Sequence, residues 1–109
     1  DYSLVSVKKE ALPTVVCADC PDYMKEVLVK YHRAEPVRGF NDAVKLGANF
    51  SKVNKYYIST KNDNAVPYAL QQKMIKANGT IRKVYEMETS HLPFVVKPQD
   101  FVNIILSVR

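Results

Sequence analysis

Two residues of this chain, Asp63 and His91, are of the types that act together in nucleophilic catalysis. A carboxylate beside a histidine fixes the imidazole tautomer and stabilises the imidazolium. The histidine removes a proton from a nucleophile and later returns it to the leaving group. Taken singly, an aspartate in a turn is usually a cap and a histidine after a strand is usually a surface residue. The elements around the two residues therefore decide whether they can meet.

The second half of the chain has a regular pattern of strand and helix signals. The predicted elements are a strand over 55–60, a polar turn over 61–65, a helix over 67–77, a strand over 81–88, a loop over 89–96 and a final helix from residue 98. Two strands joined through a helix lie parallel in one sheet, and ligands gather beyond the carboxyl ends of such strands. Asp63 follows the first strand and His91 follows the second, so the pattern predicts both side chains at one edge of the sheet.

The first half of the chain is less regular. Loose alternation predicts an exposed strand over 3–8, and residues 10–17 are compatible with a short helix or with a strand. A helix with one apolar face is predicted from Pro21 to about His32. The stretch from Arg33 to Val44 holds Pro36, Gly39 and an Asn-Asp pair, and it predicts an extended linker.

Cys17 and Cys20 form a Cys-x-x-Cys motif ahead of the helix that Pro21 begins. If residues 12–16 form a strand, this arrangement predicts an alternative function, a thiol oxidoreductase of glutaredoxin-like type, in which the helix N-terminus lowers one thiol pKa. Such folds also need a proline that opens a later apolar strand, whereas Val66-Pro67 opens a predicted helix. Buried, unreactive cysteines in a helix are the more ordinary interpretation.

Composition argues against several other classes of function. The net charge is +5, but the basic residues are spread along the chain, so we expect no nucleic-acid partner. No apolar run approaches the ~20 residues that span a bilayer, so we expect no membrane partner. Histidine occurs only at His32 and His91, without the spacing of a zinc site, so we expect no metal. The first residue, Asp1, follows no initiator methionine and opens no signal peptide, so we expect the natural chain to begin earlier.

Two segments resemble a known family. Residues 57–67 with Leu70-Gln71 resemble the acid-bearing turn, and residues 88–94 with 97–101 the histidine-bearing loop, of the α/β-hydrolase group that contains plant methylesterases and hydroxynitrile lyases, with bacterial relatives. The order and spacing of acid and histidine match that group. The resemblance implies that Asp63 is the acid of a Ser-His-Asp triad and that His91 is its general base and acid.

The resemblance also implies a fold. It is the C-terminal segment of an α/β-hydrolase, with two parallel strands, flanking helices and part of the helical cap. Residues 18–21 resemble the end of the cap in bacterial members, which makes residues 10–17 helical. Residues 1–40 are then part of the cap, or lid, and residues 41–109 are the C-terminal part of the core.

The chain departs from the family pattern in two respects. It contains no Gly-x-Ser-x-Gly, because its glycines are Gly39, Gly47 and Gly79. The nucleophile is expected before Asp1, so this chain alone is not expected to complete a catalytic cycle. The expected partner is the N-terminal part of the same hydrolase, missing or present as a separate chain.

The second departure concerns the residue after the histidine. The resembling lyases have a lysine there, which can meet a developing cyanide anion, whereas this chain has Leu92. An apolar Leu92, which we expect to line the substrate pocket, favours hydrolysis of a small carboxylic ester without any cofactor. Hydroxynitrile lyase-like activity of the complete protein is the alternative. A third interpretation is a non-catalytic interaction module, because a two-stranded sheet leaves an unpaired edge that can pair with another chain.

Overall fold

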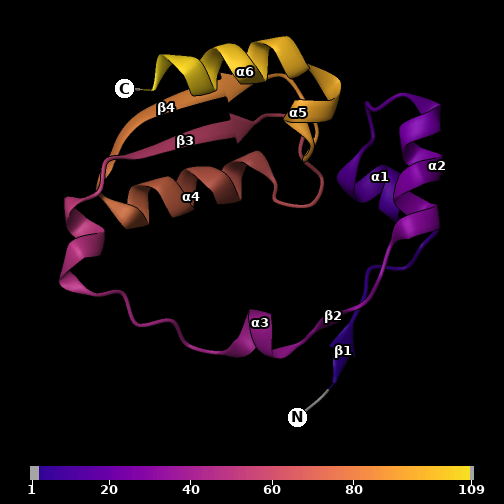
Figure 1. Cartoon of the computed structure of the whole chain (residues 1–109), viewed down its shortest axis with the longest axis horizontal. Coiled ribbons are helices and arrows are strands. Elements are labelled where there is room, and N and C mark those ends of the chain that lie inside the picture. The colour runs from indigo at the N-terminus through magenta and orange to yellow at the C-terminus, as the bar shows by residue number, and fades with distance from the viewer. Residues whose placement is uncertain (1–2, 109) are drawn as a thin grey trace.

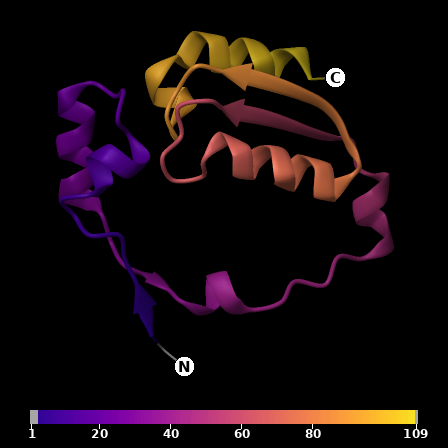
Figure 2. The same ribbon diagram turned by 180° about the vertical axis from the view of Figure 1, so that it is seen from behind.

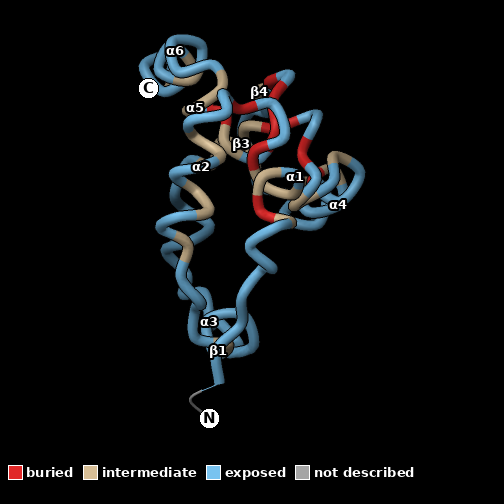
Figure 3. The backbone as a smooth tube through the Cα atoms, turned by 90° about the vertical axis from the view of Figure 1, so that its right-hand side faces the viewer, coloured by how far each residue is buried: buried red, intermediate tan, exposed pale blue. Residues whose placement is uncertain are grey.

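The computed structural model describes residues 3–108, and its C-terminal half is a three-layer unit built on a two-stranded sheet (Figure 1). Strands β3 (Lys55–Thr60) and β4 (Ile81–Met87) are parallel, and helix α4 (Tyr68–Asn78) connects them. Helix α6 (Pro98–Ser107) lies on the opposite side of the sheet from α4 (Figures 1 and 3). Alternate strand residues point to opposite faces of the sheet. On one face, Ser59 accepts a hydrogen bond from Gln72 of α4, and on the other, Tyr85 accepts one from Ser107 of α6.

The ends of these elements follow from local chemistry. Pro67 caps the N-terminus of α4, where its missing N–H costs nothing. Gly79 ends α4 at φ 67°, a left-handed conformation that glycine adopts without strain. The strand, helix and parallel pairing predicted for residues 55–88 are therefore confirmed, as is the helix from Pro98. The loop predicted over 89–96 is corrected in part, because Pro93–Val96 form the short helix α5.

The N-terminal half is made of short elements joined by long turns. Strand β1 (Leu4–Val5) pairs antiparallel with β2 (Glu35–Pro36), and helix α1 (Leu12–Val16) is followed by α2 (Asp22–Tyr31). Helix α3 (Arg38–Asn41) and the 3-10 helix η1 (Ala48–Lys52) lead to β3. The strand predicted over 3–8 is shortened to two residues. The linker predicted over 33–44 is extended only in part, because α3 interrupts it. The undecided segment 10–17 is helical over Leu12–Val16.

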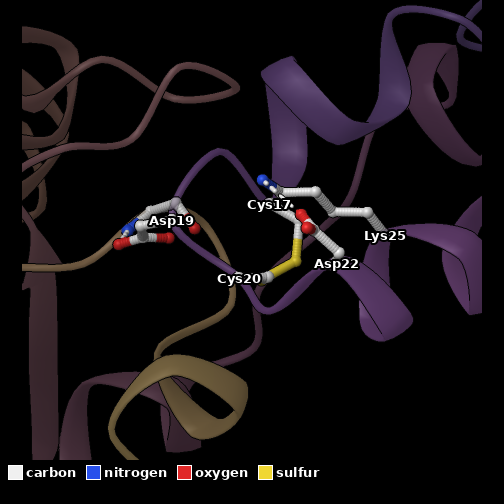
Figure 4. The surroundings of a disulfide bond; sticks show 6 residues. Cys17, Asp19, Cys20, Asp22 and Lys25 are labelled. Atoms are coloured by element: carbon white, nitrogen blue, oxygen red, sulfur yellow. Dashed lines mark hydrogen bonds and ion pairs between the residues drawn. A yellow bond between two sulfur atoms is a disulfide. The ribbon is translucent and has the colours of Figure 1, made fainter.

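The two cysteines form a disulfide in the turn between α1 and α2 (Figure 4). Both are buried, and their Cα atoms lie 5.1 Å apart. The interpretation of the cysteines as residues of a helix is therefore wrong, because they lie between two helices and are bonded to each other. The strand that a glutaredoxin-like thiol site needs before its first cysteine is replaced by helix α1, which removes the structural basis of the oxidoreductase alternative.

The buried core is small and lies to one side. Its apolar members in the described residues are Leu12, Cys17, Cys20 and Met87. Buried segments gather where α1 meets the ends of β3 and β4, whereas α2, α3 and α6 are largely exposed (Figure 3). The segment from β2 through α3 to η1 runs as an arc away from the sheet (Figure 2). The radius of gyration is 15.9 Å, against about 13 Å for a compact chain of this length. The chain is thus more open than a self-contained domain.

Within residues 3–108, no helix is long and apolar enough to cross a bilayer.

Candidate active site

The two segments that carry Asp63 and His91 run side by side beyond the carboxyl edge of the sheet. The backbone pairing of β3 and β4 continues past the strands, because the Lys61 amide donates to the Met87 carbonyl at 3.0 Å and the Asn62 amide to the Thr89 carbonyl at 3.0 Å. Lys61 also forms ion pairs with Glu86 and Glu88 at 3.2 and 3.0 Å. These contacts hold the turn after β3 against the loop after β4.

Asp63 and His91 are in direct contact at this edge. The Nδ1 atom of His91 lies 2.8 Å from Oδ2 of Asp63. The Asp63 side chain is 2% exposed and the His91 side chain is 41% exposed. A buried acid thus meets a histidine whose ring reaches the surface. The sequence prediction that both residues stand at one sheet edge agrees with this geometry.

Three further donors surround the Asp63 carboxylate. The Thr60 hydroxyl donates to Oδ2 at 2.8 Å, and the Ala65 and Val66 amides donate to Oδ1 at 2.8 and 2.9 Å. Burial raises the pKa of Asp63, but the hydrogen bonds from Val66, His91 and Thr60 together outweigh burial and lower that pKa below its ordinary value. The carboxylate is therefore held ionised although it is buried.

The ionised carboxylate determines which histidine tautomer fits. A carboxylate without a proton can only accept, so the Nδ1 atom of His91 must carry the hydrogen in the contact with Asp63. The neutral ring then has its lone pair on Nε2, which is the nitrogen that can take a proton from a nucleophile. The contact between Asp63 and His91 can therefore orient His91 as a general base.

Gln71 supports the acid from behind. Its side chain is almost fully buried and its amide oxygen accepts from the Thr60 amide at 3.0 Å. Its amide nitrogen lies within bonding distance of the Thr60 carbonyl and hydroxyl oxygens and of the Val66 carbonyl, at 2.9, 3.2 and 2.7 Å. Gln71 thus ties helix α4 to the residues on both sides of Asp63.

Thr60 and Gln71 both lie in the segments that resemble the acid-bearing turn of the hydrolase family, but no role was predicted for either residue. Gln71 is the fourth residue of α4 and is followed by the polar residues Gln72 and Lys73, so the periodicity of apolar residues does not predict its burial. Thr60 was predicted as the last residue of a strand and as part of the segment that carries the resemblance. Its position three residues before Asp63 is a further clue, because a short hydroxyl side chain at that spacing can hydrogen-bond to a side chain in the turn that follows.

An apolar cavity adjoins the pair along the edge of β3. Its volume is about 340 Å³. Its lining includes Asp63 and His91 and the apolar side chains of Tyr57, Ile58, Val66, Met74, Pro93, Phe94 and Phe101. Leu92 is half-buried, does not line this cavity, and begins the turn that leads into α5. Its substrate-binding role stays a prediction.

The described part of the chain contains no group of three or more His, Cys, Asp or Glu side chains that could hold a metal ion.

The lowered pKa of Asp63 gives a testable pH dependence. Because the folded chain holds the carboxylate ionised more strongly than the unfolded chain, the unfolded chain binds the proton first as the pH falls. The resulting stabilisation is complete well above the unfolded pKa of about 3.9 and is lost as the pH falls below it, toward the lower folded pKa. Urea unfolding of the protein between neutral pH and about pH 3 should show this loss. Asp63→Asn should be less stable at neutral pH and should show a shallower acid slope; equal slopes would contradict the account.

Gln71→Ala tests the support behind the acid. The substitution leaves the buried amide and carbonyl of Thr60 without their partner, and the expected loss in the free energy of unfolding is about 2–4 kcal/mol. Gln99→Ala on the exposed face of α6 is the matched control, with an expected change within about 0.5 kcal/mol. Chemical denaturation measures both. Similar small losses for the two variants would show that Gln71 does not hold the turn.

Part of the chain is similar in sequence to known proteins. No family model matches it. Over 62 residues it is 40% identical to a chloroplastic protein of Arabidopsis thaliana named as methylesterase 11, and over 61 residues it is 36% identical to one named as methylesterase 13. The matched regions are 56% and 55% of this chain but only 16% and 14% of those proteins. The chain therefore matches less than a fifth of the length of these relatives.

Solved structures resemble nearly the whole chain. A methylesterase from Arabidopsis superposes with a TM-score of 0.86 at 24% identity, over 94% of this chain and 44% of that one. Polyneuridine aldehyde esterase superposes with a TM-score of 0.83 at 16% identity, over 99% of this chain and 48% of that one. A pyrethroid hydrolase reaches a TM-score of 0.72 at 18% identity. Each match covers about half of the solved protein. The chain is homologous to plant methylesterases and has the α/β-hydrolase fold, of which its two parallel strands and flanking helices form a C-terminal segment.

Proposed function

We propose that this chain supplies the acid and the base of a serine hydrolase that acts on small carboxylic esters. The observation that carries the proposal is the 2.8 Å contact between Oδ2 of the buried Asp63 and Nδ1 of His91, whose ring reaches the surface. The homology to methylesterases supports ester hydrolysis as the reaction. No metal or organic cofactor takes part in the proposed reaction.

In the proposed reaction the chain contributes proton transfer. Nε2 of His91 takes the proton of a serine hydroxyl as the serine oxygen attacks the ester carbonyl. The imidazolium, paired with Asp63, then gives that proton to the alkoxide as its bond to the carbonyl carbon breaks. The alkoxide leaves as an alcohol, and the acyl group stays bonded to the serine as an acyl-enzyme. Water attacks the acyl group with the same histidine as base, which releases the acid and restores the serine.

The serine must come from outside these 109 residues, because they contain no Gly-x-Ser-x-Gly. We propose the N-terminal part of the same hydrolase as its source. In the described residues β3 pairs only with β4, so its other edge is unpaired where the apolar cavity lies. A further core strand on this edge would complete the backbone pairing and cover the cavity. On this proposal residues 1–40 belong to the cap and residues 41–109 to the core.

We propose an esterase rather than a lyase because of the residue after the base. Leu92 offers no positive charge to a developing cyanide anion, whereas an apolar side chain is compatible with an ester substrate. A mandelonitrile cleavage assay separates the two reactions.

The decisive experiment is hydrolysis of 4-nitrophenyl acetate by the complete protein that contains this chain. His91→Ala and Asp63→Asn should each lower kcat by about 10⁴-fold, because triad members act as a unit. His32→Ala, which changes the other histidine, is the matched control and should keep kcat within a few-fold of the wild type.

The 109-residue chain alone should show no turnover above buffer. Turnover by the isolated chain, or full activity of His91→Ala in the complete protein, would contradict the proposed function.

A further inference from the structure

One N-terminal segment contacts both turns of the candidate site. The Asn64 side-chain amide donates to the Thr14 carbonyl of α1 at 2.9 Å, and the Ser90 backbone amide donates to Oδ2 of Asp19 at 2.8 Å. Asn64 directly follows Asp63, and Ser90 directly precedes His91. The segment from α1 to the disulfide turn therefore contacts a sequence neighbour of the acid and a sequence neighbour of the base.

The contact with Ser90 is the stronger candidate for a functional role. Ser90 is fully buried, so its backbone amide needs a partner within the protein. The side-chain hydroxyls of Thr89 and Ser90 are buried and make no hydrogen bond in the described part of the chain. The order of this loop thus depends on its backbone contacts. The bond to Asp19 is charge-assisted, which makes it shorter and stronger than a neutral one.

The Asp19 carboxylate is presented from a closed turn. Asp19 lies between the two cysteines of the disulfide, and the Cys20 amide donates to the Cys17 carbonyl at 3.1 Å. Figure 4 shows the Asp19 side chain pointing away from the disulfide, while Asp22 and Lys25 lie on the other side of the turn. Cross-linking limits the conformations that the backbone of the turn can adopt, and so restricts the position from which the Asp19 side chain reaches Ser90.

We propose that Asp19 is a positioning residue for His91, acting through the backbone amide of Ser90. The inference rests on the proposed function, in which His91 is the base. The peptide unit that Asp19 holds joins Thr89 to Ser90 and ends at the Ser90 Cα, one residue ahead of the His91 Cα. A shift of this unit therefore moves the imidazole relative to Asp63 and to the attacking serine. A displacement of about 1 Å at a reacting group can cost about 10²-fold in rate.

The role also links the N-terminal half to catalysis. Asp19 lies in the segment that we expect to be part of the cap, and Ser90 lies in the loop after β4. Displacement of the disulfide turn would therefore act on the base through the Ser90 amide. Residues 3–108 contain no second charged side chain hydrogen-bonded to the Ser90 amide.

Steady-state kinetics of the complete protein on 4-nitrophenyl acetate tests this role. Asp19→Ala should lower kcat by about 10–100-fold with KM changed less than about threefold, because the loss affects the geometry of the base. Asp19→Asn retains an acceptor oxygen and should recover kcat to within about threefold of the wild type. Asp22→Ala is the matched control, since this carboxylate lies in the same segment but, within residues 3–108, forms its ion pair with Lys25, at 3.7 Å.

The rate of hydrogen exchange at the Ser90 amide, measured in the same variants, is a second test that does not depend on enzyme activity. Exchange should be faster in Asp19→Ala and unchanged in Asp22→Ala. If the wild type has no esterase activity but Asp19→Ala still exposes the amide, the proposed function fails and the contact stands.

An active wild type overturns the positioning role if Asp19→Ala leaves kcat and the Ser90 exchange unchanged. Equal losses in Asp19→Ala and Asp19→Asn also overturn it. If Asp19→Ala does not fold, Asp19→Glu serves instead, since it keeps the charge and displaces the acceptor; wild-type kcat in that variant overturns the role.

Discussion

The hydrogen bond between Asp63 and His91 joins two turns that are distant in sequence, and much of the local structure serves to maintain it. A buried carboxylate is costly unless donors compensate for its lost hydration. Here the Thr60 hydroxyl, two backbone amides and the His91 ring compensate, and Gln71 fixes the strand end that provides the hydroxyl. The ionised state of Asp63 and the tautomer of His91 are therefore consequences of packing around one turn.

The distribution of burial explains why so small a chain can hold an ordered site. The buried residues lie around the carboxyl edge of the sheet, where α1, the disulfide turn and the two site turns converge (Figure 3). Apolar side chains elsewhere stay exposed, among them Phe40, Val44 and Leu106. Order is concentrated at the site, and the open periphery is consistent with the proposal that more of the hydrolase packs around it.

Local signals were sufficient to predict the strands and helix over residues 55–88 and the helix from Pro98, because β-forming residues mark Lys55–Thr60 and prolines mark the helix starts, but they did not predict the short helix α5. The prediction that Asp63 and His91 lie at the same sheet edge followed from the parallel strands alone. The supporting contacts were not accessible in this way. Gln71 and Asp19 are polar residues whose roles arise from long-range packing, and the disulfide depends on a turn that propensity did not predict. Thr14, Val15 and Val16 favour strand by propensity, but tertiary contacts make them helical.

The protonation of the His91 ring tests the central claim most directly. Nitrogen NMR of the imidazole distinguishes a neutral ring that carries its hydrogen on Nδ1 from one that carries it on Nε2. The account predicts the Nδ1–H form in the wild type, because an ionised Asp63 can only accept. It also predicts loss of this preference in Asp63→Asn. A wild-type neutral ring with its hydrogen on Nε2 would contradict the account, since Nδ1 could then not donate to Asp63 and Nε2 would have no lone pair to take the nucleophile's proton.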